Sequence, residues 1–144
     1  MKNILVAVDF DNKEEQLLAK AVEFSKAFSA KICLIHVAAL SSDPFGYGTD
    51  PEQNRNFRAK ELKVEHRRLE KYSKDLEAKG IEAIALLVQG STVNTILDQA
   101  KSVNADLIIA GYEEHSFFYE ALIGSVSAKA VRKSKIPLLI VPLN

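Results

Sequence analysis

Five short apolar runs, separated by longer polar segments, constrain the fold of this chain more than any other feature. Unbroken apolar segments of this length are typical of strands in a parallel sheet that is covered on both faces. Strands that alternate with helices predict an α/β fold, a three-layer sandwich with helices on both faces of a mainly parallel five-stranded sheet. The runs are Ile4–Val8, Ile32–Val37, Ile81–Val88, Asp106–Ala110 and Ile136–Val141.

The segments between the runs have the spacing of amphipathic helices. Apolar residues recur every three or four positions in Leu17–Phe28 and again in Val93–Val103, so each segment presents one buried face. Asn12, with Glu15 three residues later, predicts the N-cap of the first helix. A short last helix is predicted over Ser125–Lys133.

The longest predicted helix, Glu52–Lys79, is highly charged and is ended by Gly80. Its basic residues are interleaved with glutamates, which allows ion pairs between residues four positions apart. We therefore interpret its charges as a solvated face and not as a nucleic-acid patch. Over the whole chain, 19 basic and 19 acidic residues cancel. The net charge therefore gives no reason to expect nucleic acid or a membrane as a partner.

Length and composition indicate an ordinary globular protein, which we expect to form a single domain over residues 1–144. The one cysteine, Cys33, excludes an internal disulfide and a cysteine metal cluster. No apolar run approaches the roughly 20 residues of a membrane span, and the first residues show no signal-peptide pattern. We therefore expect a cytoplasmic protein.

The stretch Ala105–Ser127 is the candidate for a ligand site. Its apolar run ends at Gly111, and Gly124 with Ser125 opens the last predicted helix. Glycine lets a backbone approach a ligand closely, and the N–H groups of a first helical turn suit phosphate. Alternatively, these are turn and cap residues with nothing bound. In α/β sheets, ligands bind at the carboxyl ends of the strands, where Gly111 would lie. This position favours a nucleotide site.

The sequence resembles the universal stress protein family over essentially the whole chain. The most specific feature is the nucleotide motif of that family, in which glycine, two residues, glycine and nine residues precede a glycine followed by serine or threonine. Gly111 fills the first position, Gly124 and Ser125 fill the last, and Glu114 replaces the middle glycine. The other segments that carry the resemblance are Ile4–Asp9, Leu34–Val37, Gly90 and Ala105–Ala110.

The resemblance implies a Rossmann-type fold like that of adenine-nucleotide alpha hydrolases, with ATP or AMP as ligand. It implies that Asp9 and Val37 contact the adenine. It also implies that Gly111 and Gly124 pass close to the ribose and phosphates. The residues implied to hold the phosphates are Ser125, Val126 and Ser127.

Glu114 and its neighbour His115 are the expected modulators of this site. A carboxylate near phosphate is unfavourable unless Mg²⁺ lies between them, and His115 would offset part of the charge. Alternatively, Glu114 points to solvent and the loop closes as usual, and His115 is an exposed loop residue. No catalytic residue and no metal site is expected, because the histidines lack metal-ligand spacing and no nucleophile has a convincing base.

The favoured function is that of a universal stress protein which binds an adenine nucleotide as a stress-response sensor or adaptor for an unknown protein partner. Hydrolysis of ATP would be slow or absent, because no general base is evident. The alternative is a family member without nucleotide that acts as a homodimeric interaction module. In either case the uncharged strand Ile136–Val141, expected at the sheet edge, predicts a homodimer, since such edges invite pairing. A third possibility is an enzyme that uses the nucleotide site on another substrate.

Overall fold

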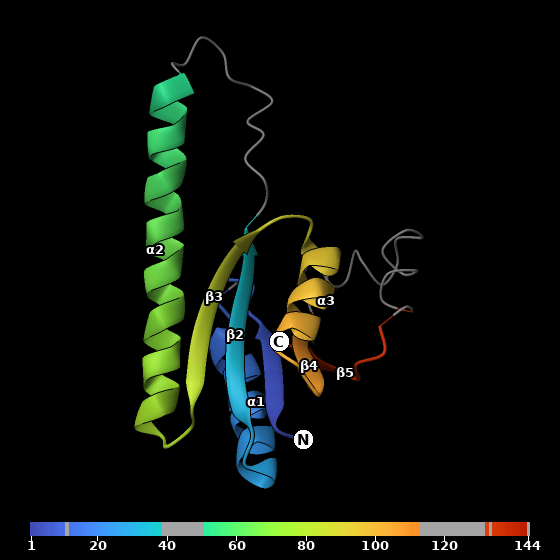
Figure 1. Cartoon of the computed structure of the whole chain (residues 1–144). Helices are drawn as coiled ribbons and strands as arrows, with labels where there is room; N and C mark the ends of the chain where they lie inside the picture. Colours follow the sequence, from blue (N-terminus) through green and yellow to red (C-terminus); the bar gives the residue numbers. More distant parts are fainter. Residues whose placement is uncertain (11, 39–50, 113–131, 133, 144) are drawn as a thin grey trace.

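Strands and helices alternate along the chain in the computed structural model, which describes residues 1–10, 12–38, 51–112, 132 and 134–143. The order of elements confirms the predicted α/β fold (Figure 1). The elements are β1 (Asn3–Ala7), α1 (Glu14–Phe28), β2 (Lys31–Ala38), α2 (Pro51–Ala78), β3 (Ala83–Gln89), α3 (Thr92–Ser102), β4 (Leu107–Tyr112) and β5 (Leu138–Pro142).

The strands form one five-stranded sheet in the order β3-β2-β1-β4-β5, and every neighbouring pair is parallel. The chain therefore builds outward from β1 to β3, returns to the other side of β1 and adds β4 and β5. The switch of direction lies between β1 and β4. β5 is an edge strand, as predicted.

Side chains on the two faces of the sheet form two separate cores, because successive residues of a strand point to opposite faces. Helices α1 and α2 pack on one face and α3 packs on the other. This double coverage explains why the central strands are apolar without interruption. On the α1 and α2 face the fully buried side chains include Ile4, Val6, Leu34, Leu69 and Ile109. On the α3 face they include Leu5, Ile35 and Ile108.

The predicted cap of the first helix is wrong. Helix α1 begins at Glu14, its N-cap residue is Lys13, and that residue makes no side-chain capping bond. Asn12 lies in the left-handed region with φ of 68°, where asparagine is more tolerated than most residues. Asn12 therefore belongs to the turn between β1 and α1 and not to the helix.

Two strands begin two residues later than predicted. Strand β3 begins at Ala83 and not at Ile81, because the Ile81 N–H donates to the Leu76 carbonyl and so completes the end of α2. Gly80, with φ of 81°, ends this helix as predicted. Strand β5 begins at Leu138 and not at Ile136, since Pro137 has no N–H to donate to a ladder.

The predicted helix Ser125–Lys133 lies almost wholly outside the described residues, as does the segment from 39 to 50. Within the described ranges, no helix has the length and apolar character needed to cross a bilayer.

Candidate nucleotide site at the carboxyl ends of the strands

Three of the residues predicted to bind nucleotide meet at one edge of the sheet. In the register of the parallel ladders, Ala7 at the end of β1 pairs with Ile35 of β2 and with Ala110 of β4. Asp9, Val37 and Gly111 follow these positions by one or two residues. The fold therefore brings an acidic side chain and two strand ends together at the point where the strand order switches, where α/β sheets bind ligands.

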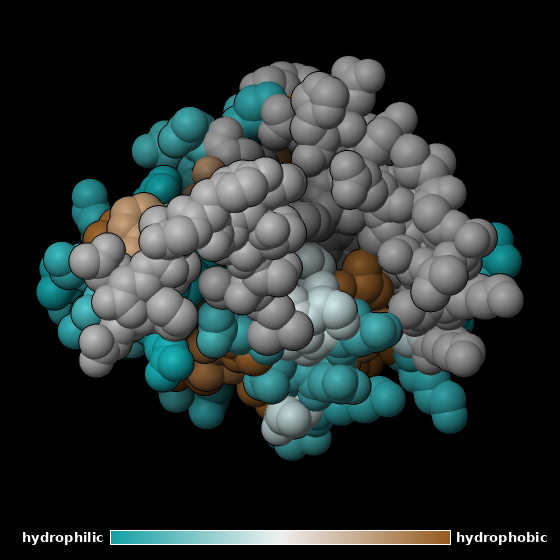
Figure 2. Space-filling model, turned by 90° about the horizontal axis from the view of Figure 1, so that it is seen from above, coloured by the Kyte–Doolittle hydropathy of each residue, from teal (hydrophilic) through white to brown (hydrophobic). Residues whose placement is uncertain are grey.

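The remaining predicted site residues lie outside the described residues. These are Glu114, His115, Gly124, Ser125, Val126 and Ser127. Their roles stay predictions. Seen from the carboxyl ends of the strands, near-neutral and hydrophobic residues lie near the centre of the described surface, and hydrophilic residues lie below them in the view (Figure 2).

Asp9 and Val37 offer different groups to a ligand. Val37 is only 7% exposed and its side chain belongs to the core on the α3 face, so the backbone is the part of this residue that a ligand could read. Asp9 is half-buried and carries a carboxylate, which can accept a hydrogen bond from an exocyclic amine. The pair has the chemistry expected of an adenine contact.

Gly111 has a packing role that the sequence did not indicate. A Cβ atom at this position would collide with the side chain of Leu143, which follows β5. The Leu143 side chain therefore occupies the space into which a side chain at position 111 would project. A ligand near Gly111 would have to meet its backbone from another direction.

A second glycine, Gly90, allows close packing at the end of β3. A Cβ atom here would collide with the side chain of Thr95 in the first turn of α3. The Gly90 N–H donates to the Ala38 carbonyl at 3.2 Å. Gly90 thus joins the ends of β2 and β3 to the start of α3. It has a structural role at this edge of the sheet.

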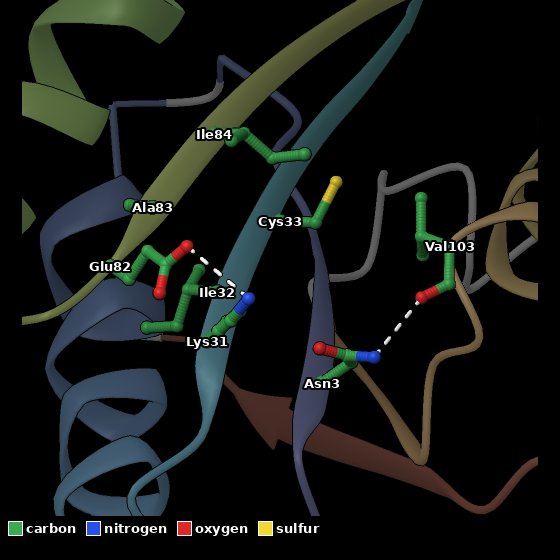
Figure 3. A pocket seen from close by; sticks show the side chains of 8 residues that line it. All are labelled: Asn3, Lys31, Ile32, Cys33, Glu82, Ala83, Ile84 and Val103. Carbon is green, nitrogen blue, oxygen red and sulfur yellow. Dashed lines mark hydrogen bonds and ion pairs between the residues drawn. The ribbon is translucent and has the colours of Figure 1, made fainter.

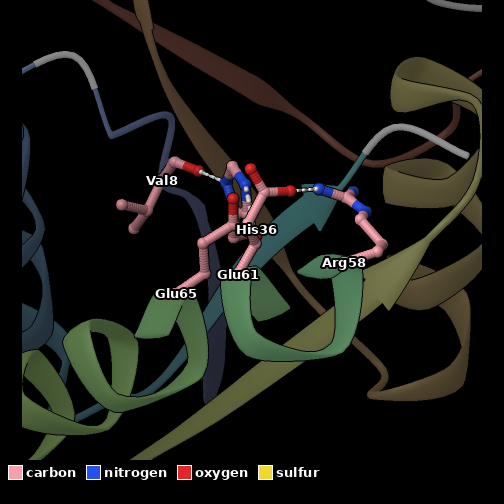
Figure 4. Close-up of polar contacts among 5 residues, drawn as sticks. All are labelled: Val8, His36, Arg58, Glu61 and Glu65. Carbon is pink, nitrogen blue, oxygen red and sulfur yellow. Dashed lines mark hydrogen bonds and ion pairs between the residues drawn. The ribbon is translucent and has the colours of Figure 1, made fainter. Parts of the chain in front are cut away.

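The backbone just before Asp9 is held by β2. The N–H of Val8 donates to the Ile35 carbonyl at 2.7 Å, and the carbonyl of Val8 lies 2.7 Å from Nδ1 of His36 (Figure 4). Because a carbonyl can only accept, Nδ1 must be the protonated nitrogen that donates. Both backbone groups of Val8 are therefore engaged, and Asp9 begins from a fixed position. No pattern in the sequence indicates that His36 holds this turn.

A small pocket at the opposite end of the strands is a poor candidate for a nucleotide site. It has a volume of about 180 Å³, below the roughly 300 Å³ at which ligand pockets begin. The ion pair between Lys31 and Glu82, 3.3 Å long, lies at the pocket (Figure 3). The pocket is lined by Asn3, Lys31, Ile32, Cys33, Glu82, Ala83, Ile84 and Val103.

Cys33, which faces this pocket, is not a reactive thiol. Its side chain is 7% exposed, and burial raises its pKa to about 11. A thiol with so high a pKa is almost entirely protonated near neutral pH, and the thiolate is the nucleophile. Among the described residues, no group of three or more histidine, cysteine, aspartate or glutamate side chains is placed to hold a metal ion.

Comparison with known proteins agrees with this architecture. The model of the universal stress protein family matches residues 1–142. The chain belongs to the universal stress protein family. Universal stress protein C of Salmonella typhimurium is 34% identical over 148 residues, which cover 98% of this chain and 95% of that protein. Universal stress protein YxiE of Bacillus subtilis is 30% identical, with 96% of this chain and 97% of that protein covered.

Several solved structures share the fold. The protein MJ0577 superimposes with a TM-score of 0.76 at 26% identity, covering 98% of this chain and 95% of that one. A universal stress protein family member from Arabidopsis thaliana with AMP bound has a TM-score of 0.61 at 19% identity, covering 100% and 93%. The universal stress protein from Archaeoglobus fulgidus in complex with dAMP has a TM-score of 0.59 at 22% identity, covering 100% and 98%.

Proposed function

We propose that this universal stress protein binds an adenine nucleotide, AMP or ATP, at the carboxyl ends of β1, β2 and β4. The observation that carries the proposal is that Asp9, Val37 and Gly111 meet at the switch point of the sheet. Family members of the same fold have been solved with AMP and dAMP, and this supports adenine as the base.

In the proposed complex, the Asp9 carboxylate accepts from the exocyclic amine and the Val37 backbone meets the ring edge. The phosphates are assigned to the N–H and hydroxyl groups of Ser125, Val126 and Ser127, next to Gly124. A Mg²⁺ ion would accompany ATP if the Glu114 carboxylate faces the phosphates, since oxygen ligands suit this cation.

The proposed role is that of a cytoplasmic sensor or adaptor in the stress response. Binding rather than catalysis is the activity, and the occupied site presents a different surface to an unidentified protein partner. Any hydrolysis of ATP is slow on this view.

The test is calorimetric titration of the protein with AMP, ATP and adenosine. Asp9→Ala should weaken all three ligands about 10- to 100-fold, the effect of losing a hydrogen bond to a charged group. Asp75→Ala is the matched control, because Asp75 is an exposed aspartate on α2, and it should leave binding unchanged. Absence of binding by the wild type, or equal binding by wild type and Asp9→Ala, contradicts the proposal.

A second candidate function, a homodimeric interaction module without nucleotide, is favoured by the position of β5. This strand lies at the sheet edge, and Leu138, Leu139 and Ile140 are only partly buried in the single chain. An uncharged edge with apolar side chains is suited to pairing with a second copy. Sedimentation velocity should show a dimer at micromolar concentration, and a monomer there would contradict this candidate.

A further inference from the structure

The turn that carries Asp9 is in contact with side chains of helix α2 as well as of strand β2. We call residues Val8–Phe10 the β1 turn. The ring of Phe10 lies 4.5 Å from the ring of His36, centroid to centroid, at an interplanar angle of 44°. On α2, the guanidinium carbon of Arg68 lies 4.5 Å from the Phe10 centroid. Phe10 therefore contacts both elements.

Arg68 also ties this arrangement to α1. Its Nη2 atom lies 3.4 Å from Oε1 of Glu14, and the Glu14 side chain is only 4% exposed. A buried carboxylate needs such a partner, because an unpaired buried charge is costly. The position of Arg68 over Phe10 is thus fixed by a second contact, and α2 is coupled to the β1 turn.

The contact between His36 and Glu65 of α2 is different, because it is favourable only with a proton. Nε2 of His36 lies 3.8 Å from Oε2 of Glu65 (Figure 4), and that buried oxygen accepts no hydrogen bond from a described residue. The proton on Nδ1 is already used by Val8. A neutral His36 would therefore turn the lone pair of Nε2 toward a carboxylate, and two acceptors would face each other.

The other charged side chains near His36 have partners of their own. On α2, Glu61 is paired with Arg58 at 3.0 Å, and Arg68 is directed to Glu14. Across the β2–β3 ladder the residue opposite His36 is the apolar Leu87. The β1 turn contributes Asp9, which makes interactions of its own. Glu65 is therefore the carboxylate that faces Nε2.

We propose that His36 and Glu65 are positioning residues that hold the β1 turn by an ion pair, which exists only when Nε2 of His36 carries a proton, so that adenine binding and protonation of His36 are linked. The inference rests on the proposed function, because the turn presents Asp9 to adenine. When the Nε2 proton is lost, Nε2 and the Glu65 carboxylate repel each other. The His36 ring then shifts, its Nδ1–H bond to the Val8 carbonyl weakens, and the binding-competent turn is less populated. The apparent affinity for adenine falls in proportion to the fraction of molecules in which the β1 turn keeps its binding-competent position.

The test is calorimetric titration with adenosine between about pH 5.5 and pH 9, a range that spans the protonation of histidine. Adenosine is used because it has no phosphate that titrates. Wild-type affinity should fall about three- to tenfold toward high pH, the effect of one hydrogen bond. Glu65→Gln should bind with the same affinity at every pH, because the glutamine amide donates to Nε2 of a neutral imidazole. A wild type without pH dependence, or a Glu65→Gln variant that keeps it, overturns the proposal.

Helix α2 offers a matched control. Nε2 of His66 lies 3.4 Å from Oε1 of Glu70, an exposed pair four residues apart on the same helix. Glu70→Gln makes the same chemical change at a histidine–glutamate pair that does not touch the β1 turn. This variant should keep the pH dependence of the wild type. Loss of the dependence in Glu70→Gln would mean that helix charge is responsible, and it would also overturn the proposal.

Failure of the proposed function can be told apart from failure of the proposed ion pair between His36 and Glu65. If the wild type binds neither adenosine nor AMP nor ATP at any pH, the proposed function is wrong. In that case the amide resonances of Val8 and Asp9 still report the turn by NMR. They should shift with pH in the wild type and in Glu70→Gln and stay constant in Glu65→Gln. Equal shifts in all three proteins overturn the proposed role of His36 and Glu65.

Discussion

At the amino ends of the strands the polar groups are paired within the edge itself, whereas at the carboxyl ends they depend on side chains from distant elements. On the amino side, Asp106 accepts from the N–H groups of Lys2 and Asn3 at 2.8 and 3.0 Å. The Asn3 amide donates to the carbonyls of Val103 and Asn104, both at 3.2 Å. On the carboxyl side, the turn before Asp9 is held by His36 and by Phe10 under Arg68.

The difference suggests that the two edges of the same sheet have different roles, stability at the amino edge and ligand binding at the carboxyl edge. The amino edge closes its own hydrogen bonds, and the pocket beside Asn3 and Lys31 has a volume of about 180 Å³. The carboxyl edge brings an acidic group and strand ends together, and contacts with α1 and α2 hold the turn that carries the acidic group. We expect changes at the amino edge to affect stability alone, and changes at the carboxyl edge to affect ligand binding as well.

The largest expected effect is on the free energy of unfolding, and it is predicted for Gly111→Val at the carboxyl edge. The added side chain collides with Leu143, and overpacking of this kind costs about 1–3 kcal/mol of unfolding free energy. Chemical denaturation measures this cost. In a Leu143→Ala background the same change should cost less, as a double-mutant cycle would show. An equal cost in both backgrounds would mean that Leu143 is not the obstacle.

The next effect concerns the predicted phosphate contacts. Ser125→Ala combined with Ser127→Ala should weaken ATP about tenfold, because each lost hydrogen bond contributes about 0.5–1.5 kcal/mol. Adenosine, which lacks phosphate, should bind as before. Calorimetric titration with both ligands makes the distinction. If ATP and adenosine weaken equally, the assignment of these serines to phosphate is wrong.

A smaller effect is expected for Glu114→Gly. In buffer without Mg²⁺, removing the negative charge assigned to the neighbourhood of the phosphates should tighten ATP about two- to fivefold, in the range of a solvent-exposed charge interaction. Adenosine should change less, and the gain should shrink in high salt because screening removes it. Titration at two salt concentrations tests this. Equal binding of ATP by both proteins would indicate that Glu114 points to solvent.

The smallest effect is expected at the amino edge, for Asp106→Asn. The two backbone hydrogen bonds hold the pKa of the Asp106 carboxyl below its usual range. Since the folded pKa is the lower one, the stabilisation is present above the unfolded pKa of about 3.9 and is lost as the pH falls through the folded value. The melting temperature of Asp106→Asn should therefore be slightly lower at neutral pH and equal in strong acid. Nucleotide binding should not change.

The fold could be predicted from the sequence because buried parallel strands leave a clear pattern. Runs such as Leu107–Ala110 are buried on both faces, so no polar residue interrupts them. The errors arose where one residue serves two elements. Ile81 is apolar and buried like a strand residue, yet its N–H completes the end of α2. Asn12 is a common capping residue, but here it occupies a left-handed turn.

The candidate site could be predicted only in part. The position of Asp9, Val37 and Gly111 at one edge follows from parallel strands, whose carboxyl ends share one side of the sheet. The residues that hold the β1 turn could not be found in this way. Arg68 meets Glu14 across 54 positions of the sequence, and this contact depends on how α2 packs on the sheet. The filling of space above Gly111 by Leu143 likewise depends on the path of the chain after β5.

Helix α2 is much longer than the strand against which it packs. Its 28 residues extend about 42 Å at 1.5 Å per residue, and its amino-terminal turns continue past the end of β3 (Figure 1). Among its described side chains, the buried ones are Leu69, Ser73 and Leu76, all in the later half. Amide hydrogens should therefore exchange with solvent rapidly before about residue 60 and slowly after Leu69. Glu65 and Arg68 stand at this boundary, where local unwinding of the helix would release the turn that carries Asp9.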